Sequence, residues 1–185
     1  MAVHADDKTL LLEFADPATR ESAYTRIVRK YQERIYWHIR RMVIHHEDTN
    51  DVMQNVFIKM WKHLDGFRED SQLFTWIYRI ATNESLSYLE KNKKRNSHAA
   101  SLDNELLNLS NTIRAEKHFD ASKLEWKLQL AIQQLPEKQR VVFNLRYYEE
   151  MPYEAMSKIL ETSEGALKAS YHHAVKKVEE YILNH

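Results

Sequence analysis

Hydrogen-bonding side chains gather in one helical stretch near the carboxyl end of the chain, at Ser163, Lys168, Ser170, His172 and His173. Lysine, and to a lesser degree serine and histidine, can bond the base edges and phosphates of a major groove. The hydroxyl of Ser163 can also cap the helix that it precedes. These side chains belong to a helix-turn-helix pattern, and it is this pattern that makes duplex DNA the expected partner.

Two short helical segments and a turn must position these side chains. The apolar residues of the first segment follow helical spacing: Ala155, Met156, Ile159 and Leu160,. A turn at residues 161–162 follows, and residues 136–143 form an extra leading helix. Helices joined by so short a turn cross steeply, so the second can enter a major groove. The pattern predicts a helix-turn-helix, with an ordinary helical hairpin as the alternative.

The composition indicates a nearly all-helical protein, because 185 residues include only two glycines and three prolines,. Lysine plus arginine equals aspartate plus glutamate at 27 each. With no overall positive charge, phosphate contacts must come from local clusters. Two such clusters occur: Arg26, Arg29, Lys30, Arg34, Arg40 and Arg41 early in the chain, and Lys91, Lys93, Lys94 and Arg95 in the middle.

Several classes of site are not expected. The chain has no cysteine, which excludes disulfides and thiolate metal sites,. The adjacent pairs His45–His46 and His172–His173 point about 100° apart on a helix and are poorly spaced to hold one metal ion. No catalytic constellation or cofactor motif stands out. Without a signal peptide or a membrane-length apolar run, we expect a cytoplasmic protein.

Hydrophobic periodicity predicts two small helical domains joined by a flexible linker. In the first domain, residues 1–95, we expect helices over 17–44, from a cap near Asp48 to Leu64, and from Asp70 or Ser71 to about 92. The polar residues 96–121 form the linker. In the second domain, residues 122–185, the expected helices span about 123–134, 137–149, 152–160 and 163–183.

Two separated blocks, residues 50–83 and 135–174, together resemble a sigma-70 family RNA polymerase sigma factor of the extracytoplasmic function (ECF) group. The first block includes the run Asp51-Val52-Met53-Gln54-Asn55-Val56-Phe57-Ile58 and the second begins Leu135-Pro136. The resemblance implies a promoter-specificity subunit. Its first domain would be region 2, which recognises the −10 element and core polymerase, and its second would be region 4, which reads the −35 element.

The resemblance also implies roles for particular residues. The −10 contacts would be Phe67, Arg68, Ser71, Gln72, Trp76, Arg79 and Asn83. The core-polymerase contacts would be Asp51, Gln54, Asn55, Phe57, Ile58 and Trp61. The −35 contacts would be Ser163, Glu164, Gly165, Ala166, Lys168, Ala169, Ser170, His172 and His173. For Trp76 the residue pattern alone leaves a core position equally open.

The chain departs from the family pattern in two places. Ser87 and Glu90 stand where the family has an acidic and a basic residue, so phosphate contacts should pass to the basic cluster at 91–95. The recognition helix keeps only Lys168 of its usual basic residues. Since bidentate guanine contacts need arginine or lysine, we expect an A/T-rich −35 element.

The resemblance implies core RNA polymerase, promoter DNA and an anti-sigma factor as partners, and no cofactor. A stand-alone helix-turn-helix regulator would explain residues 122–183 but not the block at 50–83. A helical adaptor or an enzyme that binds a small ligand would need a buried polar cluster in the first domain, and the sequence offers none.

Overall fold

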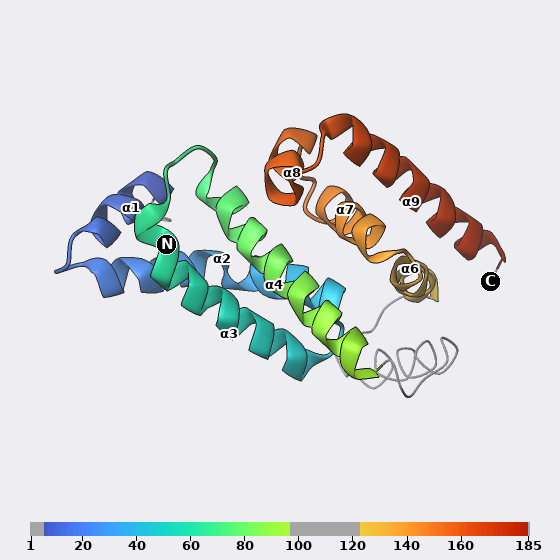
Figure 1. Ribbon diagram of the computed structural model, residues 1–185, viewed down its shortest axis with the longest axis horizontal. Helices are drawn as coiled ribbons and strands as arrows, with labels where there is room; N and C mark the ends of the chain where they lie inside the picture. Colours follow the sequence, from blue (N-terminus) through green and yellow to red (C-terminus); the bar gives the residue numbers. More distant parts are fainter. Residues whose placement is uncertain (1–5, 97–122, 185) are drawn as a thin grey trace.

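The computed structural model describes residues 6–96 and 123–184, and within these ranges it contains helices and no strand (Figure 1). The first unit comprises α1 (Asp7–Ala15), α2 (Arg20–Val43), α3 (His46–His63), the short 3-10 helix η1 (Leu64–Gly66) and α4 (Leu73–Asn96). The second comprises α6 (Lys123–Gln133), α7 (Glu137–Tyr147), α8 (Tyr153–Leu160) and α9 (Glu164–Asn184). The predicted all-α class is confirmed, whereas the predicted linker at 96–121 falls almost entirely outside the described residues.

The first unit is built around α2, which packs against α1, α3 and α4. Its buried residues recur at helical spacing along α2, α3 and α4: Ile27, Ile35, Ile39, Val52, Val56, Met60, Ile77 and Ala81. This spacing gives each helix one apolar face. The polar faces of α3 and α4 therefore remain at the surface.

The ends of the helices correct some of the sequence-based predictions. The α2 helix begins at Arg20 rather than at residue 17, and it ends at Val43, because Ile44 has a φ of 76°. Since α3 already begins at His46, its N-cap is His45 rather than Asp48 or a residue beside it, and the Asp48 carboxylate lies in the first turn, where it interacts favourably with the helix dipole,. The α4 helix begins at Leu73, not at Asp70 or Ser71.

The second unit contains the predicted helix-turn-helix, α8 and α9. Glu161 ends α8 in a left-handed conformation with a φ of 51°. The Ser163 hydroxyl accepts a hydrogen bond from the Ala166 N–H at 3.3 Å, which confirms it as a capping residue of α9. Phe143 of α7 and Ala174 of α9 are buried together with α6, so α6 and α7 support the recognition helix.

The two units pack directly against each other. The α8 helix lies beside α4, and α7 contacts α2 (Figure 1). One apolar cluster runs through both units and includes Ile77 of α4 together with Val142, Met151 and Met156 of the second unit. The helix-turn-helix is therefore attached to the helix that carries the predicted −10 contacts.

A buried histidine lies in the core of the first unit. His38 is fully buried, and one of its ring nitrogens, Nε2, shares a hydrogen bond of 2.9 Å with the Thr82 hydroxyl. Burial lowers the pKa of His38 to about 3, and the Arg41 guanidinium acts in the same direction. The folded protein therefore holds this imidazole neutral.

His38 should make the protein less stable as the pH falls. Below about pH 6.5 the unfolded chain binds a proton that the folded chain refuses until about pH 3,. The contribution of His38 to the free energy of unfolding is thus fully present above about pH 6.5. It falls between about pH 6.5 and pH 3, at about 1.4 kcal/mol per pH unit,. Urea unfolding at pH 7 and at pH 5 should show that the free energy of unfolding falls less between these pH values in His38→Gln than in the wild-type protein. The exposed His63, changed to Gln, serves as the control and should keep the wild-type slope.

Candidate nucleic-acid and protein interfaces

The loop of residues 67–72 between η1 and α4 presents an aromatic ring beside polar side chains. Phe67 is half-buried, and its ring centroid lies 5.6 Å from that of Trp76. Arg68 and Gln72 are exposed, and Ser71 is half-buried. This arrangement offers an apolar wall with hydrogen-bonding groups around it, as capture of an unpaired base requires.

The exposed face of α4 continues this surface. Arg79 and Asn83 are both exposed and stand one helical turn apart, so they lie on the same side of α4,. Trp76 is only 8% exposed and belongs to the core. Its ring packs against Phe67 at an interplanar angle of 54°, so among the predicted −10 residues Trp76 is a buried neighbour of the loop rather than an exposed contact.

The outer face of α3 carries most of the predicted polymerase contacts. Asp51, Gln54 and Asn55 are exposed, and Ile58, at 46% exposure, adds an apolar side chain to this polar face. Mixed polar and apolar surfaces of this kind suit a protein interface. The structure thus brings these side chains together on one helix.

Phe57 and Trp61 are placed differently, because both are half-buried. The Trp61 ring packs edge-on against Phe14 and Tyr24, with centroids 5.6 and 5.0 Å away. The Tyr24 hydroxyl donates to the Phe57 carbonyl oxygen at 2.5 Å. These two residues fix α3 against α1 and α2 and present only part of their side chains to a partner.

The amino-terminal half of α9 exposes nearly all of the predicted −35 contacts. The exposed members are Ser163, Glu164, Gly165, Ala166, Lys168, Ala169, His172 and His173, while Ser170 is half-buried. The Lys168 ammonium lies 3.8 Å from the Glu164 carboxylate and 5.5 Å from the centre of the Tyr153 ring. Both contacts of Lys168 lie at the surface, where such interactions are weak, so its ammonium group stays accessible to solvent,.

The basic clusters are partly engaged between the two units. Lys93 of α4 forms an ion pair of 2.6 Å with Glu137 of α7. Arg34 and Arg41 of the early cluster both pair with Glu149, a residue that the sequence analysis did not single out. The i, i+7 spacing of the two arginines places them on one face of α2, but no sequence pattern connects them to a carboxylate that lies 115 and 108 residues away from them,.

The histidine pairs form no metal site among the described residues, where no group of three or more potential ligands occurs. Both ring nitrogens of His46 already face neighbours, the Tyr36 hydroxyl at 2.7 Å and the Asn50 amide at 3.2 Å. Within the same residues, no helix is long and apolar enough to span a membrane.

Comparison with known families gives two matches in chain order. Sigma-70 region 2 matches residues 27–95, and Sigma-70, region 4 matches residues 125–178. The first match contains the α3 and α4 surfaces and the loop between them, and the second contains the helix-turn-helix. Helix α1 lies before the first match.

Curated relatives are similar along most of their length. The chain is 29% identical to the RNA polymerase sigma-H factor of Pseudomonas aeruginosa over 163 residues, which cover 85% of this chain and 84% of that one. It is 29% identical to the ECF RNA polymerase sigma-E factor of Haemophilus influenzae, with 88% of each chain covered. The sigma-E factor of Escherichia coli K12 is 27% identical over 165 residues.

Solved structures share the fold. The sigma factor RpoE from Bartonella quintana, in complex with the anti-sigma factor NepR, has a TM-score of 0.68 at 17% identity, with 86% of this chain and 96% of that one covered. CnrH in complex with the cytosolic domain of CnrY has a TM-score of 0.67 at 19% identity, with 94% and 95% covered. Both matches include helices from both units of the present chain.

Proposed function

The chain belongs to the ECF group of the sigma-70 family, and we infer that its two helical units divide promoter recognition between them. As a sigma factor it binds core RNA polymerase and directs the enzyme to specific promoters. The observation that carries the residue-level proposal is the aromatic loop 67–72 beside the exposed Arg79 and Asn83. Such a surface would suit single-stranded DNA, and it occurs in the same chain as a helix-turn-helix,.

The loop and α4 would capture the −10 element in its unpaired form. A flipped base would stack against Phe67, which Trp76 supports, while Arg68, Ser71 and Gln72 reach its hydrogen-bonding edge. Arg79 and Asn83 would then hold the neighbouring nucleotides of the same strand. Because stacking tolerates any base, discrimination would come from the polar side chains around the ring.

The exposed amino-terminal half of α9 would enter the major groove at the −35 element. Lys168 is its only strong basic donor, and apart from the Glu164 carboxylate the other exposed side chains are small or neutral. Base contacts would therefore be few, and the shape of an A/T-rich groove would contribute to specificity.

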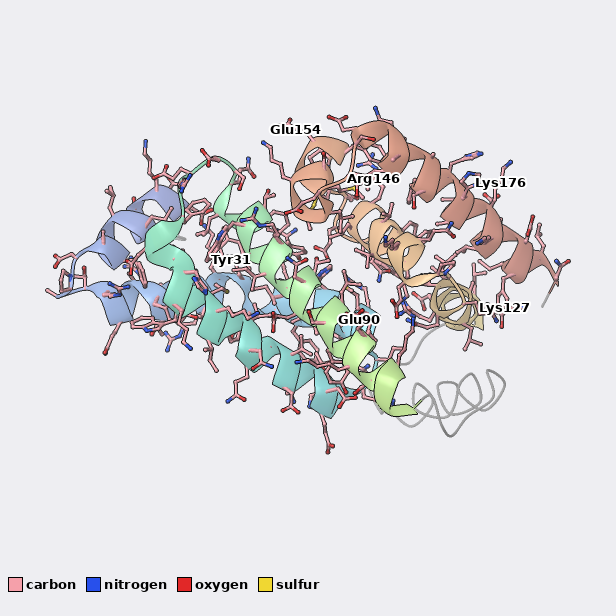
Figure 2. The ribbon with its side chains drawn as sticks, in the orientation of Figure 1. Tyr31, Glu90, Lys127, Arg146, Glu154 and Lys176 are labelled. Atoms are coloured by element: carbon pink, nitrogen blue, oxygen red, sulfur yellow. The ribbon has the colours of Figure 1, made fainter. Side chains whose placement is uncertain are left out.

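Lys168→Ala should reduce initiation at promoters that depend on a −35 element by about fivefold or more, because a good base contact contributes roughly 1–3 kcal/mol. Run-off transcription on templates with an intact and a scrambled −35 element measures the effect. Lys176→Ala is the matched control, since Lys176 lies on α9 and points outward from it (Figure 2). Equal losses from both substitutions, or a loss that persists on the scrambled template, would contradict the assignment.

The outer face of α3 would dock on core polymerase, with Asp51, Gln54, Asn55 and Ile58 as its centre. Phe57 and Trp61 would complete it at the edge. We assign no catalytic residue and no cofactor, because the chemistry belongs to the polymerase. We expect the protein to act in the cytoplasm, where its polymerase partner works, and an anti-sigma factor to regulate it, as the relatives solved with NepR and CnrY suggest.

The experiment that tests this function is run-off transcription with purified core polymerase on a genomic promoter library. The protein should select a set of promoters that core polymerase alone does not transcribe. Tight binding to duplex promoter DNA without polymerase, and no transcripts with it, would instead identify a stand-alone regulator.

A further inference from the structure

A buried carboxylate joins the two units. Glu149 lies in the connection between α7 and α8, and its side chain is only 6% exposed. One carboxylate oxygen accepts a hydrogen bond of 2.9 Å from Arg41 Nη1. The other accepts one of 2.7 Å from the Tyr78 hydroxyl and a longer one, 3.4 Å, from Arg34 Nη2. All of these donors belong to the first unit, so this carboxylate bonds entirely across the interface.

The second unit also holds Arg41 from other sides. The Arg41 guanidinium lies 4.1 Å from the centre of the Tyr148 ring, next to Glu149 in the chain. Its backbone carbonyl accepts a hydrogen bond of 3.1 Å from the Gln133 amide at the end of α6. Arg41 is thus held by an ion pair with Glu149, by the Tyr148 ring against its guanidinium plane and by a hydrogen bond to its backbone carbonyl. Together these contacts define how α2 and α7 align.

Burial makes these contacts interdependent. A carboxylate removed from water is costly unless it stays paired and hydrogen-bonded. Burial and the charge of Glu149 raise the pKa of the Tyr78 hydroxyl, which keeps this group protonated as a donor. If the units part, Glu149 must return to water and Arg41 must lose three kinds of contact together.

The closed arrangement conflicts with reading a whole promoter. The −10 and −35 elements lie about 25 base pairs apart, or roughly 85 Å along duplex DNA at about 3.4 Å per base pair. The α4 helix, at 24 residues, is only about 36 Å long, and α8 packs against it,. With α8 against α4, the two DNA-binding surfaces stay within one compact body and cannot reach both elements together.

We propose that Glu149 is an electrostatic latch which, through Arg34, Arg41 and Tyr78, sets the balance between this closed form and an open form able to span a promoter. The latch regulates the promoter-binding surfaces and so rests on the proposed function. Release of the carboxylate would precede or accompany loading onto core polymerase. The apolar contacts between α4 and α8 bury surface but allow several relative positions of the two units. The directional hydrogen bonds of Glu149 select one of these positions.

The distance between the units in the free, full-length protein tests the latch directly. The chain has no native cysteine, so Gln32→Cys on α2 and Glu180→Cys on α9, both at exposed positions, accept one spin label each. Double electron–electron resonance then reports the distribution of distances. The otherwise unaltered protein should show one short, narrow population.

Glu149→Gln keeps the size of the side chain and removes its charge. It should raise the ratio of open to closed molecules by about tenfold or more, seen as a broad population at longer distances. Glu150→Gln, at the exposed neighbour, is the matched control and should leave the narrow population unchanged. An unchanged distribution in Glu149→Gln, equal changes in both variants, or a broad distribution without either substitution would overturn the proposal.

A second variant covers the case in which Glu149→Gln loses helical circular dichroism. Tyr78→Phe removes only the hydroxyl donor and should give a smaller opening, about threefold, without loss of helicity. No opening in a folded Tyr78→Phe protein would then count against the latch.

Transcription distinguishes this proposal from the function on which it rests. Glu149→Gln should support run-off initiation at least as well as the parent protein, with the largest advantage at limiting core polymerase. Opening without any transcription by either protein would refute the sigma function alone. Transcription by both proteins with identical distance distributions would refute the latch alone.

Discussion

Holoenzyme that carries Phe67→Ala should bind fork-junction DNA with an unpaired −10 strand at least tenfold more weakly than wild type. A base stacked on an aromatic ring contributes roughly 1–3 kcal/mol, and alanine leaves no such surface beside Trp76. Asn83→Ala should weaken binding to a similar degree through lost hydrogen bonds, and because Asn83 is exposed the substitution removes no core packing. A fluorescence titration on the fork template measures both effects.

The control for this experiment separates binding from folding. Ser87→Ala changes another exposed polar residue of α4, one turn further along, and should bind the fork normally. Binding to duplex −35 DNA should be unaffected in all three variants. If Phe67→Ala holoenzyme binds the fork as tightly as wild type, the base-capture role assigned to the loop is wrong.

Asp51→Ala combined with Gln54→Ala should reduce co-purification with core polymerase by tenfold or more. Both side chains are exposed on α3, so their removal costs little stability. At an interface each would leave an unpaired polar group on the polymerase, with a penalty of about 1–3 kcal/mol apiece. Pull-down with tagged core enzyme measures the loss.

The matched control is Lys62→Ala, which changes an exposed charge at the other end of the same helix. Helical circular dichroism should be the same for the control and the double variant. Normal recovery of the double variant with core polymerase would place the docking surface elsewhere.

Local patterns predicted the helix-turn-helix well. The helical spacing of the buried residues in α8 and the Ser163 cap depend only on neighbours within a turn or two of helix. Such local relations can be read directly from the sequence. The predicted cap at Asp48 failed for an equally local reason. The backbone of Ile44 turns to a positive φ, which β-branched residues rarely adopt, and α3 begins two residues later at His46, ahead of Asp48,.

Contacts between distant segments were beyond prediction from the sequence. The residue pattern left Trp76 equally suited to the core or to DNA, and only the packing of the loop places it against Phe67. Likewise, Glu149 looks like any surface acid beside Glu150. Its burial depends on how α7 docks on α2, and no periodicity within one helix carries that information.

The apolar cluster that runs from α4 into α7 and α8 also has a consequence for measured affinities. A ligand that requires the open chain sees an apparent dissociation constant equal to the intrinsic one divided by the open fraction. If about 1% of free molecules are open, promoter DNA binds about 100-fold more weakly than its contacts alone would allow. A weak affinity of the isolated protein for promoter DNA would then reflect the rarity of the competent state as well as the quality of the contacts, and comparisons between relatives would need both quantities.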